Sequence, residues 1–315
     1  MITTGVQYLK KIHERLGYPL GKVQYKTQMI MEKLQESGSP LRHVRRIAYK
    51  TMNPGEILRR KMHARNFTRN LKPGIAACAR ELGEKGFTYF TEEVDPQLLQ
   101  ELNTYYDDVI SKRSATAKPQ PTHPFFFSLS NPEEHTTDNV LVRFALQDSI
   151  LQAVTAYFGC VPLISGIHVT ESRSVTIDSE RMRASQQWHM DYSAGGDDEV
   201  SVWVHMTDVN SLEQGPFTYI PIPGSRKVKN DFFPRRIRDE EIVGAGLAGE
   251  VKHAFGPRST VFIMNSLKIY HMGSRLAPGN KRVVCIFTYV KPGKYKDFVK
   301  ITTPVPQSKR MLICR

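Results

Sequence analysis

The sequence of 315 residues is poor in cysteine and has no long apolar run. Its four cysteines, Cys78, Cys160, Cys285 and Cys314, lie far apart without a Cys-x-x-Cys pair, so we expect reduced thiols and a cytoplasmic setting. No apolar stretch reaches the roughly 18 residues of a membrane span, and the first residues lack the apolar segment of a secretory signal. With 40% hydrophobic and 24% charged residues, the chain has the composition of a globular protein.

Acidic residues are scarce at the N-terminus. The first 72 residues hold 16 Lys and Arg against four Glu and no Asp, whereas the remaining 243 residues hold 28 basic and 27 acidic side chains. The net charge of +13 therefore lies almost entirely in the first part. We predict two parts, a basic helical N-terminal extension (residues 1–72) and a nearly neutral domain (residues 73–315).

The basic extension predicts attraction to an anionic partner that weakens with salt. Membrane headgroups, nucleic acid and an acidic protein all fit, and headgroups would make the protein peripheral to a membrane surface. The alternative is a solvated helical face that binds nothing.

Apolar residues change their spacing along the domain. Helical spacing is found in residues 75–82, 95–110 and 148–158. Strands are expected at residues 161–170, 200–209, 260–265 and 282–290. Gly and Pro turns separate these strands, which predicts a mainly β protein with flanking α-helices and a closed β-architecture.

Residues 111–139 are rich in Pro, Ser and Thr and predict a long loop. Loops of this length in compact domains are often functional lids, so Phe126, in the middle of three consecutive Phe residues, is a candidate contact to a substrate. The alternative is that the three rings anchor the loop in the core.

Residues 187–192 read Gln-Trp-His-Met-Asp-Tyr, and this stretch carries the chemistry. On a strand, His189 and Asp191 point to the same side and can bind one metal ion. A 2-His-1-carboxylate triad, typical of non-haem Fe(II) oxygenases, needs one more His. We predict His271, which is followed by an apolar strand; His205 and His253 are the competing candidates.

Arg282 lies on that apolar strand, beside Val283 and Val284. A buried guanidinium without a partner is costly, and a carboxylate that pairs with it through two hydrogen bonds removes the cost. The carboxylate belongs either to a bound ligand or to an internal Asp or Glu.

Together these motifs resemble the phytanoyl-CoA dioxygenase family of Fe(II)/2-oxoglutarate-dependent oxygenases, over roughly residues 83–290. The motifs that carry the resemblance are Gln187, Trp188, His189 and Asp191, then Gly215 and Pro216, then Pro223, Gly224 and Ser225, then His271, Gly273 and Ser274, and last Arg282. Residues 1–72 lie outside the resemblance.

The resemblance implies a double-stranded β-helix (jelly-roll or cupin-like) core with Fe(II) bound by His189, Asp191 and His271. Arg282, assisted by Ser274, would bind the distal carboxylate of 2-oxoglutarate, and O2 would be the other co-substrate. The implied reaction is hydroxylation of a substrate C–H bond with release of succinate and CO2. Because halogenating relatives carry a small residue in place of the carboxylate ligand, Asp191 favours hydroxylation or a related oxidation.

The substrate is less well defined by the sequence. We predict a small-molecule, carrier-linked or anionic glycolipid substrate, contacted by Trp188, Tyr192, Phe126 and Arg226. Arg226 stands where the family usually has His, which puts one such contact in doubt.

Two other functions are compatible with parts of the sequence. A nucleic-acid-directed oxygenase would carry a second Arg six residues after Arg282, where this chain has Thr288, so nucleic acid is the less favoured partner. A non-catalytic β-barrel that serves as a binding or scaffold protein would use its basic N-terminal helices instead. The sequence sets no expectation for the oligomeric state.

Overall fold

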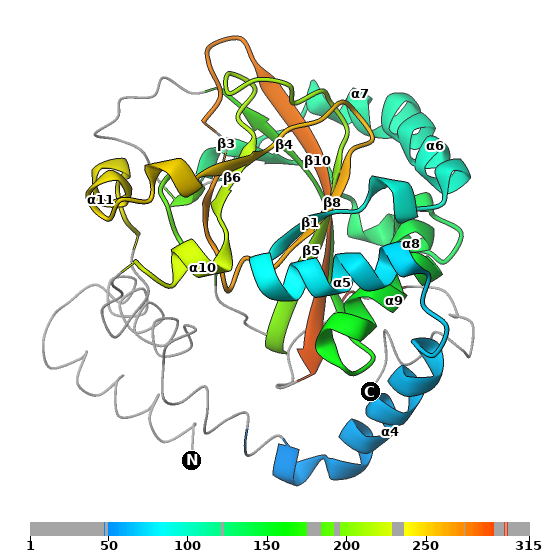
Figure 1. Cartoon of the computed structure of the whole chain (residues 1–315). Helices are drawn as coiled ribbons and strands as arrows, with labels where there is room; N and C mark the ends of the chain where they lie inside the picture. The colour runs from blue at the N-terminus through cyan, green and yellow to red at the C-terminus, as the bar shows by residue number, and fades with distance from the viewer. Residues whose placement is uncertain are drawn as a thin grey trace, which may run out of the picture.

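The computed structural model describes residues 47, 50–120, 123–174, 184–191, 196–228, 236–273, 275–292, 299 and 301 of the chain. Its core is a pair of antiparallel β-sheets, with most helices on the outer face of the larger sheet (Figure 1). Among the described residues, no helix combines the length and apolar character that crossing a membrane requires.

The larger sheet has seven strands in the order β1-β8-β5-β10-β4-β3-β2. They are β1 (Phe87–Tyr89), β2 (Pro119–Gln120), β3 (His123–Ser128), β4 (Leu163–Arg173), β5 (Gly196–His205), β8 (Val261–Met264) and β10 (Lys281–Pro292). The smaller sheet has the order β7-β6-β9, with β6 (Phe217–Ile220), β7 (Lys252–Ala254) and β9 (Tyr270–Met272).

Strands alternate between the two sheets along the chain. After β4, His189 bridges to β9 of the smaller sheet, and β5 returns to the larger one. Strands β6 and β7 pair with each other in the smaller sheet, and β8, β9 and β10 alternate again. This winding is that of a jelly roll. The predicted double-stranded β-helix core is confirmed.

The two faces of the larger sheet differ. On β10, Val283, Cys285, Phe287 and Tyr289 point outward into the main hydrophobic core, which the helices cover. Arg282 and every second residue after it point inward, toward the smaller sheet. Because β10 pairs with both β4 and β5, its register decides which side chains share the inner space.

The helices are α4 (Pro54–Phe67), α5 (Pro73–Lys85), α6 (Pro96–Tyr105), α7 (Ser111–Ser114), α8 (Val140–Ala145), α9 (Asp148–Phe158), α10 (Ile222–Ser225) and α11 (Asp239–Gly244). Pro begins α4, α5 and α6, where the missing N–H costs nothing. Asp95 caps α6 by accepting the Gln97 N–H at 2.9 Å. Left-handed glycines, Gly86 and Gly159, end α5 and α9.

The predicted long loop at residues 111–139 is wrong in its centre, because β3 lies there and pairs with β4. Phe125 and Phe127 are buried, and Phe126 is half-buried on the other face of the strand. Alternate aromatic side chains suit a strand with one buried face. The core-anchor alternative therefore holds for the two outer Phe residues.

The boundary predicted at residues 72/73 falls between α4 and α5 and stays a prediction. Helix α4 packs against the domain through Arg60, whose Nη1 donates to the carbonyls of Val161 and Pro162 at 3.4 and 3.3 Å. Residues 1–46 lie outside the described residues.

Candidate metal centre

Three predicted ligands meet between the sheets. His189 and Asp191 lie on the extended segment that follows a 3-10 turn (Ala184–Gln186), and His271 is the central residue of β9. The backbones of His189 and His271 exchange two hydrogen bonds of 2.9 Å, and the Asp191 N–H donates to the Ser266 carbonyl at 3.0 Å. Main-chain pairing therefore sets the spacing of the three side chains.

The ligand atoms are close enough to share one ion. Asp191 Oδ1 lies 3.5 Å from His189 Nε2, and Asp191 Oδ2 lies 3.5 Å from His271 Nε2. Within the described part of the chain, this is the one group of at least three His, Cys, Asp or Glu residues whose ligand atoms lie within 4.8 Å of one another. Neighbouring ligands about 2.1 Å from an ion lie about 3 Å apart, so small shifts suffice.

Backbone carbonyls orient both rings. His189 Nδ1 is 2.8 Å from the Gln187 carbonyl, and His271 Nδ1 is 3.2 Å from the Ile269 carbonyl. Since a carbonyl only accepts, each Nδ1 carries the proton and each Nε2 presents its lone pair. This is the tautomer that a metal-binding histidine needs.

The charges at the site also suit a cation. Burial and the neighbouring His189 lower the pKa of His271 to about 4, so its ring is neutral at pH 7. Burial alone would raise the pKa of Asp191, but His271, His189 and a hydrogen bond from Ser266 outweigh it and hold this pKa well below its usual range. The site thus offers a neutral nitrogen and a carboxylate to a divalent ion.

The competing histidines lie elsewhere. His253, on β7, has its Nδ1 2.9 Å from the Thr218 hydroxyl. His205, on β5, packs edge-on against Phe262 with ring centroids 5.4 Å apart. Neither belongs to the cluster of ligand atoms.

Arg282 lies between the two sheets, close to the end of β9, the strand that carries His271. The residue is 2% exposed, and its Nη1 donates to the Gly215 carbonyl. A Cβ on Gly273, two residues after His271, would come within 3.5 Å of Nη2. Burial lowers the pKa of Arg282 to about 10, which leaves the guanidinium charged at neutral pH.

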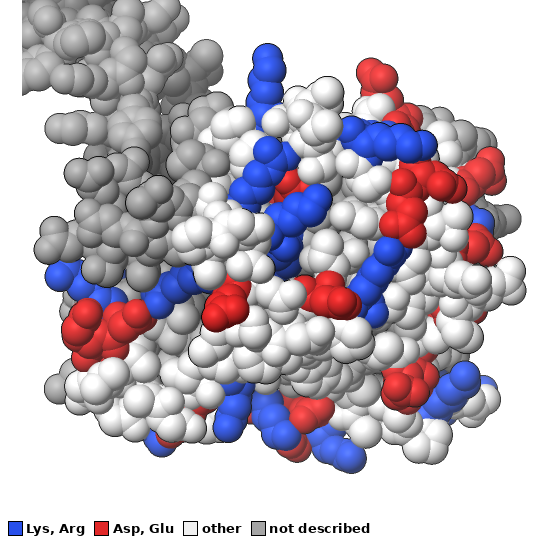
Figure 2. All heavy atoms as spheres, turned by 90° about the horizontal axis from the view of Figure 1, so that it is seen from above, with Lys and Arg blue, Asp and Glu red and all other residues white. Residues whose placement is uncertain are grey.

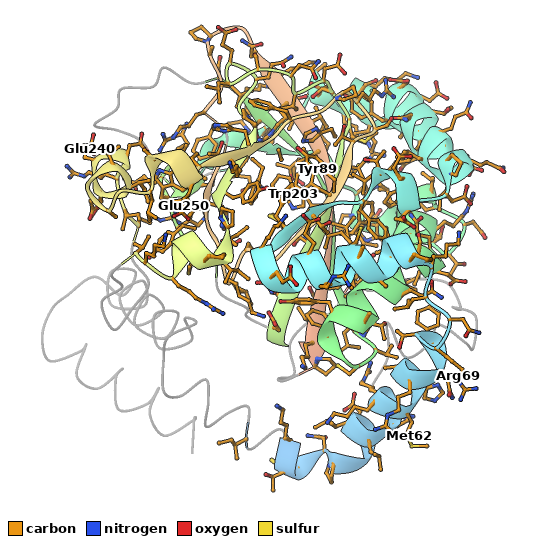
Figure 3. All side chains as sticks on the ribbon, viewed as in Figure 1. Met62, Arg69, Tyr89, Trp203, Glu240 and Glu250 are labelled. Carbon is orange, nitrogen blue, oxygen red and sulfur yellow. The ribbon has the colours of Figure 1, made fainter. Side chains whose placement is uncertain are left out.

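Two further residues of the inner face, Trp203 and His205, lie near the Arg282 guanidinium. The sequence did not predict that they would lie there. The Arg282 Cζ lies 5.9 Å from the ring centroid of Trp203, which Figure 3 labels between the sheets. The indole N–H of Trp203 and both ring nitrogens of His205 are buried without a well-formed hydrogen bond to any described residue. Buried polar groups around a buried cation suit a polar, anionic ligand.

The alternation of side chains in residues 200–209 places Trp203 and His205 on one face of a strand. Only the pairing of β5 with β10, in which His205 faces Val284 and Trp203 faces Ile286, brings that face to Arg282. Burial and the positive charge of Arg282 lower the pKa of His205 to about 4 against a smaller opposing effect of the Gly256 backbone, so its ring is neutral.

The residues that we predicted to contact the substrate, as far as the structure describes them, lie in different surroundings. Trp188 is buried in a cluster with Ile220 and Tyr270, and its indole N–H donates to Asp239 at 2.8 Å, which favours a structural role. Phe126 pairs with Ser172, which pairs with Arg282, so these three side chains share the inner face. Arg226 is exposed just after α10. Tyr192 and Ser274 lie outside the described residues.

Asp239 holds the segment of residues 186–191, which carries His189 and Asp191, through its contacts with Trp188 and Arg275. The sequence did not indicate this role. It accepts the Trp188 N–H and two bonds from Arg275, at 2.7 and 3.0 Å, while Arg275 Nε donates to the Gln186 carbonyl at 2.7 Å. The start of α11 is thereby tied to both chain segments that carry the ligands.

No family model matches the sequence, and no curated protein matches it. Solved structures of similar fold include AviO1 from Streptomyces viridochromogenes Tue57, EctD from S. alaskensis with bound Fe, and HygX from Streptomyces hygroscopicus with nickel, 2-oxoglutarate and hygromycin B bound.

AviO1 is 14% identical over 72% of this chain and 99% of its own, with a TM-score of 0.49. EctD is 15% identical over 74% and 88%, with a TM-score of 0.48. HygX is 16% identical over 70% and 88%, with a TM-score of 0.44. Similarity at these values assigns no function to this chain.

Proposed function

We propose that the protein is an Fe(II)- and 2-oxoglutarate-dependent oxygenase. The observation that carries the proposal is the cluster of His189, Asp191 and His271, with both Nε2 lone pairs directed by backbone carbonyls. Two imidazoles and one carboxylate on one side of an ion are the ligand set of non-haem Fe(II) oxygenases, and they leave positions open for co-substrates. We further propose hydroxylation of a C–H bond, with release of succinate and CO2.

Arg282 is the proposed partner of the 2-oxoglutarate distal carboxylate. A guanidinium binds a carboxylate through two parallel hydrogen bonds, and this one is already oriented by the Gly215 carbonyl. The Trp203 ring lies 5.9 Å from the guanidinium carbon, and its buried N–H would donate to the same ligand. When bound, Fe(II) and 2-oxoglutarate activate O2 for attack on a substrate C–H bond.

Residues around the three proposed ligands support the site by packing and hydrogen bonding. Phe217 stacks on His271, with centroids 5.2 Å apart, and limits water on that side of the ring. Ser266 holds Asp191 through its carbonyl, which receives the Asp191 N–H at 3.0 Å. These contacts hold the ligand side chains in position.

We propose an anionic substrate, in the small-molecule, carrier-linked or glycolipid class. Arg236 is near enough for its positive charge to contribute to the lowered pKa of His271. Arg226 follows Ser225, whose hydroxyl accepts the N–H of Tyr270 next to His271 at 2.9 Å. Among compounds that stimulate succinate release, anionic members should lose most of their effect in Arg236→Gln and neutral members should not; equal losses would contradict the proposed charge.

The first experiment adds Fe(II) and then 2-oxoglutarate to the anaerobic protein and follows the weak visible charge-transfer band. Wild type should develop the band, and His271→Ala should not. Arg282→Ala should bind iron but need far more 2-oxoglutarate. His253→Ala is the matched control, since it removes a histidine outside the ligand cluster, and it should behave as wild type.

No band in wild type, at concentrations where iron binding itself is measurable by calorimetry, would refute the oxygenase assignment. The non-catalytic scaffold function would then be the leading alternative. A band that survives in His271→Ala and is lost in His253→Ala would instead refute the assigned triad.

A further inference from the structure

Helix α4 exposes apolar side chains on the face opposite its attachment to the domain. Arg60 and Ala64 are buried against the domain. At 100° per residue, Leu58 and Met62 lie on the other side of the helix, one turn apart. Their exposed fractions are 60% and 57%, and Figure 3 shows Met62 at the edge of the molecule, away from the sheets.

Cations flank this apolar pair on both sides. By the same geometry, Lys61 and Arg65 lie along one border and Arg59 along the other, and all three are exposed. The only acidic residue of α4, Glu56, bonds to the buried Arg60 at 2.9 Å and does not offset the exposed charges. The face is thus an apolar centre between basic borders.

This distribution differs from that of the domain. Figure 2 shows Lys and Arg interspersed with Asp and Glu on the face seen from above. On α4 the exposed charges are of one sign. Met52 and Ile47, just before α4, add two more exposed apolar side chains, at 79% and 63%.

We propose that the exposed face of α4 docks the protein on an anionic lipid bilayer. An interfacial helix needs apolar side chains to enter the boundary between headgroups and acyl chains, and cations beside them to contact the headgroups. Leu58 and Met62 serve the first need; Arg59, Lys61 and Arg65 serve the second. A nucleic-acid surface would use the cations but would leave the apolar centre in water.

Vesicle flotation with the full chain tests the proposal. Wild type should float with vesicles of phosphatidylcholine and phosphatidylserine, should remain below with phosphatidylcholine alone, and should dissociate as salt rises. Leu58→Gln/Met62→Gln should weaken partitioning about tenfold. Lys61→Gln/Arg65→Gln should weaken it by about fivefold per charge removed.

Matched controls lie elsewhere on the surface. Leu212 and Val243 are 59% and 63% exposed, so Leu212→Gln/Val243→Gln removes similar apolar area away from α4. Lys112→Gln/Lys118→Gln removes two exposed cations in or near α7, at the opposite end of the molecule in Figure 1. Both double variants should float as wild type does.

Three results would overturn the proposal. One is wild-type flotation in both α4 variants, which would place binding outside this face. Another is no flotation with anionic vesicles, whether or not duplex DNA or RNA is bound instead. The last is concentration-dependent self-association that the Leu58→Gln/Met62→Gln variant abolishes without any vesicle binding, which would assign the face to a second copy of the chain.

Discussion

At the metal centre each imidazole is positioned at two points, at its backbone and at its Nδ1. Rotation of the two imidazole rings is also restricted, because Phe217 stacks on His271 and the centroids of the two imidazoles are 4.3 Å apart. A ligand held in this way loses little entropy when the ion binds. Contacts within the fold therefore set the geometry of the site.

Trp203→Phe isolates the proposed hydrogen bond to 2-oxoglutarate, because it keeps a ring over Arg282 and removes the N–H. One hydrogen bond to a charged group contributes about 1.5–3 kcal/mol, so 2-oxoglutarate should bind on the order of tenfold or more weakly. Titration of the charge-transfer band measures this. Iron affinity should stay unchanged, and a loss of iron binding would mean that the ring supports the ligands instead.

His205 should make stability depend on pH. Its folded pKa is about 4, below the ordinary value of 6.5, so between these values the unfolded chain binds a proton that the folded chain does not. The free energy of unfolding should therefore fall as pH decreases from 6.5 toward 4, by about 1.4 kcal/mol per pH unit from this residue, and be unaffected above that window.

Urea unfolding of wild type and His205→Gln at pH 7, 6 and 5 checks the sign. Other titrating groups contribute to both proteins, so the difference between the two slopes reports His205. Equal slopes would mean that His205 is protonated or exposed in the folded state.

At the scale of elements, α11 supports the metal segment through Asp239. Asp239→Asn keeps an acceptor for Trp188 but removes the charge that binds Arg275, so iron affinity should fall about tenfold, as is usual when a group that positions a ligand is changed. Calorimetric titration with Fe(II) measures it. Glu240→Gln, an exposed neighbour on α11, is the control and should have no effect.

A buried charged side chain, Arg60, contributes to the attachment of α4, beside the apolar contacts of Ala64 and Phe67. Arg60→Met should lower the free energy of unfolding by about 2 kcal/mol, because the carbonyls of Val161 and Pro162 and the carboxylate of Glu56 lose a donor. The adjacent Arg59 is exposed, and Arg59→Met should change stability by less than about 0.5 kcal/mol. Urea unfolding compares the two variants; similar losses would contradict the buried role of Arg60.

Strand alternation accounts for much of what could be predicted from the sequence. It groups His189 with Asp191 and places Arg282 among apolar neighbours, and both placements agree with the structure. The same alternation turns Trp188 to the opposite face from His189, so its predicted contact with substrate conflicted with the logic that found the metal site. We predicted a loop around the three consecutive Phe residues, because the flanking Pro and Ser residues are typical of loops. The structure has the short strand β3 there.

Contacts between distant segments could not be predicted in this way. Trp203 reaches Arg282 only through the register of β5 on β10, and Gly215 supplies a carbonyl, which every residue has. Asp239 meets Arg275 and Trp188 through tertiary packing alone. A single sequence carries periodicity within an element but no register between elements.

At the scale of the whole molecule, a metal ion should raise thermal stability, because the folded state binds it and the unfolded chain does not present the site. At a free concentration of 100 times Kd the gain is about 2.7 kcal/mol. Thermal unfolding with and without Fe(II), kept anaerobic, measures the rise in Tm. His271→Ala should abolish it and His253→Ala should retain it; a similar rise in both would indicate nonspecific binding.

The paired backbones of His189 and His271 bear on when iron is captured. These residues are 82 positions apart in the sequence, and β5, β6, β7 and β8 all lie between them. A contact of such long range closes late in folding, since the intervening chain must be ordered before the pairing compensates for the lost loop entropy. On a ribosome, the chain would emerge through β8 with only His189 and Asp191 in place. Metal loading should therefore be among the last steps in maturation, and a nascent chain stalled before β9 should hold no tightly bound iron.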